Sequence, residues 1–233
     1  MTIIITGASK GIGRAIAEKF AANGYSLFLC ARNKENLVSV KEELLRKYPF
    51  IHVHTKTCDV AVKEDLKIFA EWILATASSI DVLINNAGRF VDGGAYDGEG
   101  IVLEEMMQSN VYSAYYLSRF LLPKMIGQKK GHVFNICSIA SLGAYPSGGA
   151  YGITKYALAG FSANLREEMK PHNIKVTSVF PGAVYTPSWD GSGIAPDRIM
   201  KAEDIAEMIY TSAHLSAQAC VEDIVIRPQL GDL

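Results

Sequence analysis

The residues with the clearest chemical potential are Tyr151 and Lys155, which stand four positions apart in the run Tyr-Gly-Ile-Thr-Lys. On a helix, residues four apart lie on the same face, so the phenol and the ammonium group would be neighbours. A free phenol has a pKa of about 10 and is a poor proton donor or acceptor at neutral pH. A neighbouring ammonium group favours the phenolate and brings the pKa of a phenol toward a useful range. The pair predicts an acid/base device for a carbonyl or an alcohol, although this spacing also occurs by chance on amphipathic helices.

A glycine-rich loop near the N-terminus lies between a predicted strand and a predicted helix. Thr2 to Thr6 is a short apolar run that predicts a buried strand, and Gly7, Gly11 and Gly13 follow it closely. Apolar residues then recur at helical spacing, which predicts a helix over 14–23. In a strand–loop–helix unit, backbone N–H groups and the helix dipole meet the phosphates of a dinucleotide. This stretch therefore predicts a phosphate-binding loop.

The rest of the chain alternates apolar, strand-like runs with amphipathic segments. The predicted strands cover residues 25–31, 51–57, 81–85, 132–137, 174–180 and 224–226. The predicted helices cover residues 35–48, 62–77, 103–125, 150–169 and 202–215. Strands and helices that alternate at these intervals predict a parallel sheet with right-handed crossovers. Ligands of such sheets bind beyond the carboxyl ends of the strands, so residues that follow strands are the candidates for a site.

Composition and charge exclude several classes of function. The net charge is -1, from 23 basic and 24 acidic residues, which gives no electrostatic basis for binding nucleic acid. The apolar run Ile3 to Ile5 is too short for a signal peptide or a membrane span, so we expect no membrane partner. No linker or composition shift divides the 233 residues, and we expect one domain over 1–233, with a substrate loop near 186–200.

The cysteines and histidines indicate the redox state of the protein's compartment and whether a metal site is expected. Four cysteines (Cys30, Cys58, Cys137 and Cys220) are scattered and form no Cys-x-x-Cys pair. Most of them close apolar runs, where cysteine behaves as a small hydrophobic residue. This usage predicts structural burial and a reducing, cytoplasmic compartment. His52 and His54 alternate along a strand-like run without other ligands at metal-binding spacing, so we expect no metal site.

Five separated motifs, in this order along the chain, resemble those of the short-chain dehydrogenase/reductase family over nearly its whole length. They are Thr6-Gly7-x-x-x-Gly11-x-Gly13, Asn85-Asn86-Ala87-Gly88, Asn110, Ser138 with Tyr151-x-x-x-Lys155, and Pro181-Gly182-x-Val184-x-Thr186. Each motif alone is a weak signal, but the ordered set is specific. The resemblance implies a single-domain, Rossmann-like α/β fold, with a doubly wound parallel sheet of about seven strands and helices on both faces.

The same resemblance implies roles for four catalytic residues. Tyr151 would donate a proton to a carbonyl oxygen as hydride arrives, or remove it in the oxidising direction. Ser138 would hydrogen-bond the same oxygen. Lys155 would also hold the nicotinamide ribose, and Asn110 would hold a water molecule in a proton relay to Lys155.

The choice of dinucleotide depends on the residue about twenty positions beyond the glycine loop, where an acid favours NAD and an arginine favours NADP. Here the predicted second strand ends Cys-Ala-Arg-Asn with Arg32 and no carboxylate. Lys10 adds a second cation, and Ser9 offers a hydrogen bond to a phosphate, so the sequence favours NADP(H). The complete set of expected cofactor-binding residues is Gly7, Ser9, Lys10, Gly11, Ile12, Gly13, Arg32, Asp59, Val60, Asn86, Ala87, Gly88, Tyr151, Lys155, Pro181, Gly182, Val184 and Thr186.

The substrate is less well defined by the sequence. We expect its pocket between residues 88–100, 139–145 and 186–200, the last of which carries Trp189 and Asp190. The segments 181–189 and 221–228 resemble those of bacterial sepiapterin-reductase-like members of the family. This favours an NADPH-dependent, reversible reductase of a small-molecule carbonyl. Two alternatives stay open: a 3-oxoacyl thioester reductase, although the chain end departs from that pattern, and a non-catalytic NADP(H)-binding scaffold or redox sensor.

Self-association is also expected. Relatives in the family form four-helix bundles between subunits through the helices that correspond to 103–125 and 150–169. Apolar side chains occur on more than one face of these segments. They are Tyr112, Tyr115, Tyr116, Phe120, Leu158, Phe161 and Leu165. We therefore expect a homodimer or a homotetramer.

Overall fold

The computed structural model describes residues 1–189, 191 and 193–233. Asp190, which the sequence places in the substrate loop, and Ser192 lie outside the described residues. The described chain contains a sheet of seven parallel strands in the order β3-β2-β1-β4-β5-β6-β7. The chain moves outward from β1 to β3 and then returns to β4, and in such sheets ligands bind where the strand order reverses, here at the carboxyl ends of β1 and β4.

The strands are β1 (Thr2–Thr6), β2 (Ser26–Ala31), β3 (Val53–Thr57), β4 (Val82–Asn85), β5 (Gly131–Ile136), β6 (Ile174–Pro181) and β7 (Asp223–Ile226). The α-helices are α1 (Gly11–Ala22), α2 (Lys34–Lys47), α3 (Lys63–Thr76), α4 (Gly100–Met107), α5 (Ser113–Gln128), α6 (Gly149–Met169) and α7 (Ala202–Ala213). Most predicted elements are confirmed, with ends that differ by one to three residues.

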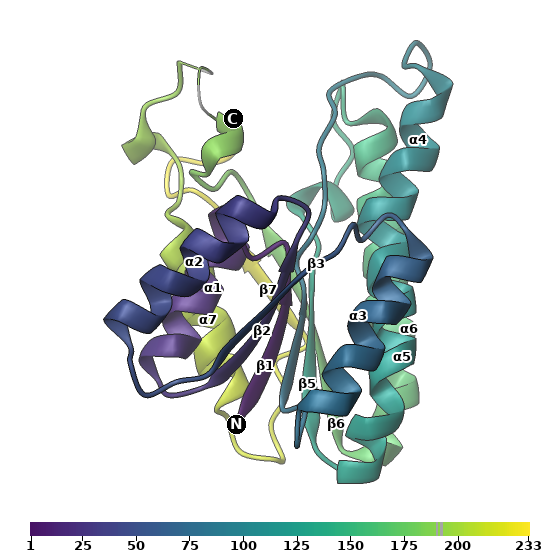
Figure 1. The fold of residues 1–233 in the computed structure, drawn as a ribbon. Coiled ribbons are helices and arrows are strands. Elements are labelled where there is room, and N and C mark those ends of the chain that lie inside the picture. Colours follow the sequence, from purple (N-terminus) through teal and green to yellow (C-terminus); the bar gives the residue numbers. More distant parts are fainter. Residues whose placement is uncertain (190, 192) are drawn as a thin grey trace.

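The helices cover both faces of the sheet. Figure 1 shows α1, α2 and α7 on one face and α3, α5 and α6 on the other. Successive residues of a strand point to opposite faces, so Ile3 and Ile5 of β1 join the core beneath α1 and α7. Ile4 joins the second core, beneath α3 and α5. The central strand β1 is therefore buried along its whole length, as expected for a parallel sheet covered on both sides, whereas the edge strand β3 (Val-His-Thr-Lys-Thr) is polar and only partly buried.

The predicted helix over 103–125 is wrong in one important respect. The structure begins this segment at Gly100 and interrupts it with a π-helical turn, Gln108–Tyr112, between α4 and α5. A π-helical turn accommodates one residue more than an α-helical turn and is frequent at functional sites. Asn110 lies in this turn and is almost fully buried. The interruption is therefore associated with a side chain that is held by contacts outside its own helix.

Burial agrees with the interpretation of the cysteines. All four are free thiols, and Cys30, Cys58 and Cys137 are buried, whereas Cys220 is half-buried. Burial raises the pKa of Cys137 to about 12, so this thiol next to Ser138 stays protonated near neutral pH. Within the described residues, no helix combines the length and the apolar character needed to cross a membrane. The same residues contain no group of three or more side chains placed to bind a metal ion.

Candidate active site

The glycine loop between β1 and α1 forms a backbone cradle that only glycine can line. Gly7 and Gly11 adopt φ values of +66° and +56°, which side-chain-bearing residues rarely adopt. A methyl group on Gly13 would lie 2.5 Å from the Gly7 carbonyl oxygen, closer than atoms can approach. The loop leads directly into the N-terminus of α1, where free N–H groups and the helix dipole attract phosphate. This arrangement fits the pyrophosphate of a dinucleotide.

The turn after β4 braces this loop from the side. Thr6 Oγ1 accepts hydrogen bonds from the N–H groups of Asn86 and Ala87, each at 3.0 Å. The Asn86 side chain donates in return to the carbonyl oxygens of Thr6 and Gly7, at 2.9 and 3.2 Å. The turn after β6 also reaches the loop, because a methyl group on Gly11 would lie 3.1 Å from Thr186 Cγ2. Three predicted motifs that are far apart in the sequence therefore meet around the cradle.

Tyr151 and Lys155 lie one turn apart in the first half of α6, as their spacing predicts. Lys155 Nζ is 5.6 Å from the centroid of the Tyr151 ring and donates a hydrogen bond of 2.7 Å to the Ile136 carbonyl oxygen. Lys155 is buried, whereas Tyr151 is half-buried. A methyl group on Gly88 would lie 3.9 Å from Lys155 Nζ, so the turn after β4 reaches this group too. The pair is therefore close to the cradle and to the end of β5.

The Asn110 side chain is completely engaged by protein groups. Its Nδ2 donates to the Arg89 carbonyl oxygen and to Thr154 Oγ1, each at 3.0 Å. Its Oδ1 accepts from the Arg89 N–H at 2.8 Å and from Ser109 Oγ at 3.0 Å. An amide offers two donors and two acceptor lone pairs, and all four are used. Asn110 thus joins α4 and α5 to the segment after β4 and, through Thr154, to the helix of Tyr151 and Lys155.

Ser138 follows β5 and begins a short 3-10 turn, Ile139–Ser141. Its Oγ accepts a hydrogen bond of 3.2 Å from the Ala140 N–H, and no acceptor for its hydroxyl proton occurs within the described chain. The end of this turn is fixed to α6, because Ser141 Oγ donates to the Lys155 carbonyl oxygen at 2.8 Å. Ser138 is therefore both a cap for the turn and a hydroxyl donor at the carboxyl edge of the sheet.

The residues expected at the adenosine end lie at the ends of β2 and β3. Arg32 follows β2 and is exposed, as is Lys10 in the glycine loop; Ser9 beside it is half-buried. Hydrogen bonds from the Ala8 N–H to the Cys30 carbonyl oxygen and from the Cys58 N–H to the Ala31 carbonyl oxygen, each 3.1 Å, join these segments. Within the described residues, no ion pair involves Arg32 or Lys10. Neither cation is therefore neutralised by an acid of the described chain.

Three of the residues expected to bind the cofactor make only local or core contacts. The Asp59 carboxylate accepts from the Ala61 N–H at 3.0 Å and so stabilises its own turn. Val60 is buried in the core under α3, and Ile12 is half-buried against the other core. None of these three residues contacts Tyr151 or Lys155 among the described hydrogen bonds, so their place in a cofactor site stays a prediction.

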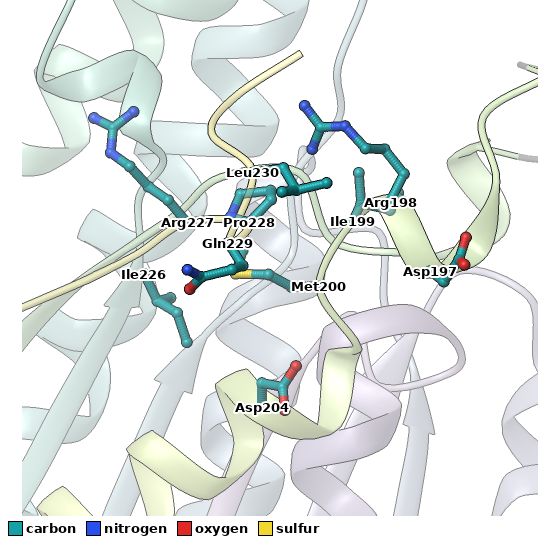
Figure 2. A pocket seen from close by; sticks show the side chains of 10 residues that line it. All are labelled: Asp197, Arg198, Ile199, Met200, Asp204, Ile226, Arg227, Pro228, Gln229 and Leu230. Carbon is teal, nitrogen blue, oxygen red and sulfur yellow. The ribbon is translucent and has the colours of Figure 1, made fainter.

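The turn after β6 is held by the segment 186–200, in which the sequence predicts the substrate loop, and by the C-terminal segment. The Gly182 N–H donates to the Ile226 carbonyl oxygen at 2.8 Å, and Val184 pairs with Met200 in an isolated bridge. Arg198 donates to the carbonyl oxygens of Gly231 and Asp232 at 3.0 and 3.1 Å. A cavity of about 310 Å³ lies between these segments. Figure 2 shows the side chains that line it, among them Arg198 and Arg227. Because its lining includes none of the four candidate catalytic residues, this cavity is not the reaction site.

Three residues near the candidate catalytic pair were not singled out from the sequence. Thr154 bonds Asn110, and its position next to Lys155 on the buried side of α6 was the available signal. The Phe90 ring lies against the Tyr151 ring, with centroids 5.0 Å apart. Tyr145, at the edge of the expected pocket, has a raised pKa because of its partial burial and because Tyr151 and Asp92 are nearby. The site is therefore more aromatic than the sequence motifs suggested.

Comparisons with known proteins agree with this geometry. The family model described as short chain dehydrogenase matches residues 1–194. A sepiapterin reductase from Chlorobaculum tepidum is 31% identical over 242 residues, which cover 99% of this chain and 97% of that protein. The structure of a metagenomic short-chain oxidoreductase in complex with NADP has a TM-score of 0.86 at 30% identity and covers 98% of this chain and 97% of its own.

An alcohol dehydrogenase from the archaeon Thermococcus sibiricus, complexed with 5-hydroxy-NADP, superposes with a TM-score of 0.90 at 27% identity. The superposition covers 98% of this chain and 96% of that one. The sheet order, the cradle, the Tyr151–Lys155 pair and the family match over most of the chain lead to one assignment. This chain belongs to the short-chain dehydrogenase family.

Proposed function

We propose that the protein is an NADPH-dependent reductase of a small-molecule carbonyl, and that it also runs in the reverse direction as a dehydrogenase. The observation that carries this proposal is the position of the buried Lys155 side chain. Its Nζ lies 5.6 Å from the centroid of the Tyr151 ring and close to Gly88, in the turn that braces the phosphate cradle. Under this proposal Tyr151 would be the proton donor and would lie next to the nicotinamide. The overall reaction would convert a ketone, NADPH and a proton into an alcohol and NADP⁺.

The residues present fit a dinucleotide. The cradle of Gly7, Gly11 and Gly13 would take the pyrophosphate, and the 181–186 turn would lie beside the nicotinamide. When bound, the reduced nicotinamide supplies a hydride. Around it, Lys155 would bind the ribose, and the Asn86 turn would hold the cradle in shape. The NADP complex of the metagenomic relative and the 5-hydroxy-NADP complex of the archaeal alcohol dehydrogenase support this choice of cofactor.

The protein groups would move one proton. The Tyr151 hydroxyl would donate it to the carbonyl oxygen of the substrate, and the Ser138 hydroxyl would donate a hydrogen bond to the same oxygen. Lys155 would favour the tyrosinate left behind. Because the Asn110 side chain is fully engaged, a relay water would have to use the Asn110 main-chain carbonyl group. The side chain itself would fix the geometry between α6 and the segment after β4.

The cofactor preference is tested by an Arg32→Asp variant. Removing the cation and adding a carboxylate is expected to weaken NADPH binding by about tenfold to a hundredfold, because a charged hydrogen bond to the 2′-phosphate is lost. NADH binding should be unchanged or tighter, since a carboxylate can accept from the ribose 2′-hydroxyl. Dissociation constants from nucleotide fluorescence measure both effects. An Arg46→Asp variant, at the far end of α2, controls for net charge. Tighter binding of NADH than of NADPH by the unmodified protein would contradict the preference.

The reaction is tested by NADPH oxidation with a panel of carbonyl compounds, namely vicinal diketones, sepiapterin and a 3-oxoacyl thioester. The similarity to a sepiapterin reductase favours the first two. The thioester alternative would need a basic surface for an acidic carrier. Lys124 instead donates to the Ala77 carbonyl oxygen, and Lys130 pairs with Asp81, at the opposite edge of the sheet from the site. Tight NADPH binding without turnover of any compound would favour the non-catalytic scaffold or redox sensor.

We also propose that the protein associates through α5 and α6, as a homodimer or homotetramer in a reducing, cytoplasmic setting. Tyr112 just before α5, Tyr115 on α5, and Ile153 and Tyr156 on α6 are large side chains that remain exposed. Two residues expected on that face, Leu158 and Leu165, belong instead to the core. A Tyr115→Glu variant is expected to shift the mass in light scattering toward the monomer, because a carboxylate would be buried at the interface. A monomeric mass for the unmodified protein would contradict the proposal.

A further inference from the structure

The Phe90 side chain contacts the residue proposed to donate the proton. Its ring centroid lies 5.0 Å from that of Tyr151, and the two planes are inclined at 85°. This is the edge-to-face arrangement that aromatic pairs favour. Phe90 is the second residue after Gly88, so it comes from the turn at the carboxyl end of β4. It therefore lies where a carbonyl compound held by Tyr151 would extend its substituents.

The backbone that carries Phe90 is fixed. Asn110 binds both the N–H and the carbonyl oxygen of the preceding residue, Arg89, at 2.8 and 3.0 Å. The segment that follows is packed on α6, because a methyl group on Gly149 would lie 2.2 Å from the Gly93 carbonyl oxygen. Contacts on both sides of Phe90 thus hold the loop. A substituent that contacts the Phe90 ring therefore contacts a preorganised surface. Preorganisation reduces the entropic cost of ordering the loop when a ligand binds.

The Phe90 ring is nevertheless poorly covered by the protein. Its side chain is 55% exposed, and Tyr145, the second aromatic residue near Tyr151, is 43% exposed. Large aromatic surfaces left open beside a reacting group are typical of ligand-binding sites, since a ligand removes them from water. The Asp92 carboxylate lies near Tyr145 and disfavours an anionic substituent there, whereas the Lys155 ammonium group lies on the Tyr151 side. An uncharged, flat, apolar group matches this surface best.

We propose that Phe90 is a specificity-determining residue, which binds an uncharged aryl substituent attached to the carbonyl group that is reduced. The inference rests on the proposed reductase function and deepens it. Phe90 takes no part in proton transfer. It would instead favour an aryl ketone over the corresponding alkyl ketone, through ring contact and through the removal of apolar surface from water.

The test compares 1-phenyl-1,2-propanedione with 2,3-butanedione, which have the same vicinal dicarbonyl group and differ by phenyl against methyl. Dissociation constants of both from the protein–NADP⁺ complex are measured by calorimetry, where no hydride is available and binding is separated from turnover. The unmodified protein is expected to bind the phenyl compound at least about tenfold more tightly. Phe90→Ala should reduce this preference by about tenfold, and Phe90→Tyr, which keeps the ring, should retain it.

Phe50→Ala is the matched control, because Phe50 is 98% exposed and lies in the connection between α2 and β3. It should leave both dissociation constants unchanged. The inference is overturned if Phe90→Ala keeps the phenyl preference of the unmodified protein, if Phe90→Tyr loses it, or if the methyl compound binds as tightly from the start. NADPH turnover of the two diketones is measured separately. Its absence would overturn the reductase function, whereas the dissociation constants would still decide the role of Phe90.

Discussion

A Tyr151→Phe variant is expected to lose a factor of about 10² to 10⁴ in kcat for NADPH-dependent carbonyl reduction, because a positioned proton donor contributes an effect of this size. The substitution removes one oxygen atom and keeps the ring, so the contacts with Phe90 and with the Lys155 ammonium group are retained. NADPH binding and the unfolding midpoint should therefore change little. Single-turnover measurements with saturating NADPH would isolate the step in which the proton is transferred.

The control for this variant is Tyr156→Phe. Tyr156 lies five residues further along α6 and is exposed, so its hydroxyl should not contribute to the reaction. The two variants lose the same atom from the same kind of side chain on the same helix. If Tyr151→Phe retained more than about a tenth of the activity, Tyr151 would not be the proton donor. Equal losses in the two variants would indicate a general effect on the helix.

Acidification is expected to destabilise the protein through His132. This residue of β5 is 4% exposed, its ring is stacked on Phe134 with centroids 3.9 Å apart, and its Nε2 is 2.7 Å from Thr177 Oγ1. Thr177 Oγ1 donates to the Val221 carbonyl oxygen, so Nε2 is the protonated nitrogen. Nδ1 is buried and has no hydrogen-bond partner within the described chain. A proton there would place a cation in the core.

Burial, with a smaller effect of the nearby Lys175 charge, lowers the pKa of His132 from 6.5 to about 3. The unfolded chain therefore takes up a proton near pH 6.5, whereas the folded protein does not until the pH is much lower. The stability from this residue is complete above pH 6.5 and falls as the pH drops toward 3. Each pH unit in that window costs about 1.4 kcal/mol, so the free energy of unfolding should fall by about 2–3 kcal/mol between pH 7.5 and pH 4.5.

Urea unfolding at these two pH values, compared between the unmodified protein and His132→Gln, measures this contribution. The variant should be less stable at neutral pH but should lack the 2–3 kcal/mol loss on acidification assigned to His132. His52→Gln serves as the control, because His52 is exposed. The same acid-induced loss in His132→Gln as in the unmodified protein would show that other groups, such as the paired carboxylates, account for it.

Much of the fold was predictable from the sequence. Unbroken apolar runs such as residues 2–6 identify strands buried on both faces, and the alternation with amphipathic helices leaves a parallel sheet as the natural arrangement. The π-helical turn at Gln108–Tyr112 was not predictable in this way. It is associated with the hydrogen bonds between the Asn110 side chain and the backbone of Arg89, which lie 21 residues apart in the sequence. Hydrophobic periodicity does not register contacts of this kind.

The candidate site likewise contains residues that the sequence predicts and residues that only the structure reveals. Residues whose types are set by backbone geometry or by reaction chemistry, such as Gly13 and Tyr151, have a recognisable spacing. Residues whose importance comes from what they contact in space, such as Phe90 and Thr154, have none. A phenylalanine in a loop is an ordinary observation in a sequence. It becomes informative only when its ring is found beside the proposed proton donor, Tyr151, and still open to solvent.

Because of the π-helical turn, the relative rotation of α4 and α5 depends on the number of residues between Gly100 and Gln128. Each residue of an α-helix turns the chain by about 100°, so the extra residue sets the phase between α4 and α5. Deleting one residue from this turn would rotate α4 about its own axis and carry Met106, now fully buried, away from the interior. A regular helix of equal apolar content would therefore not be a neutral replacement in a designed or chimeric enzyme. The number of residues in this turn therefore keeps the Asn110 side chain in reach of the Arg89 backbone and of Thr154.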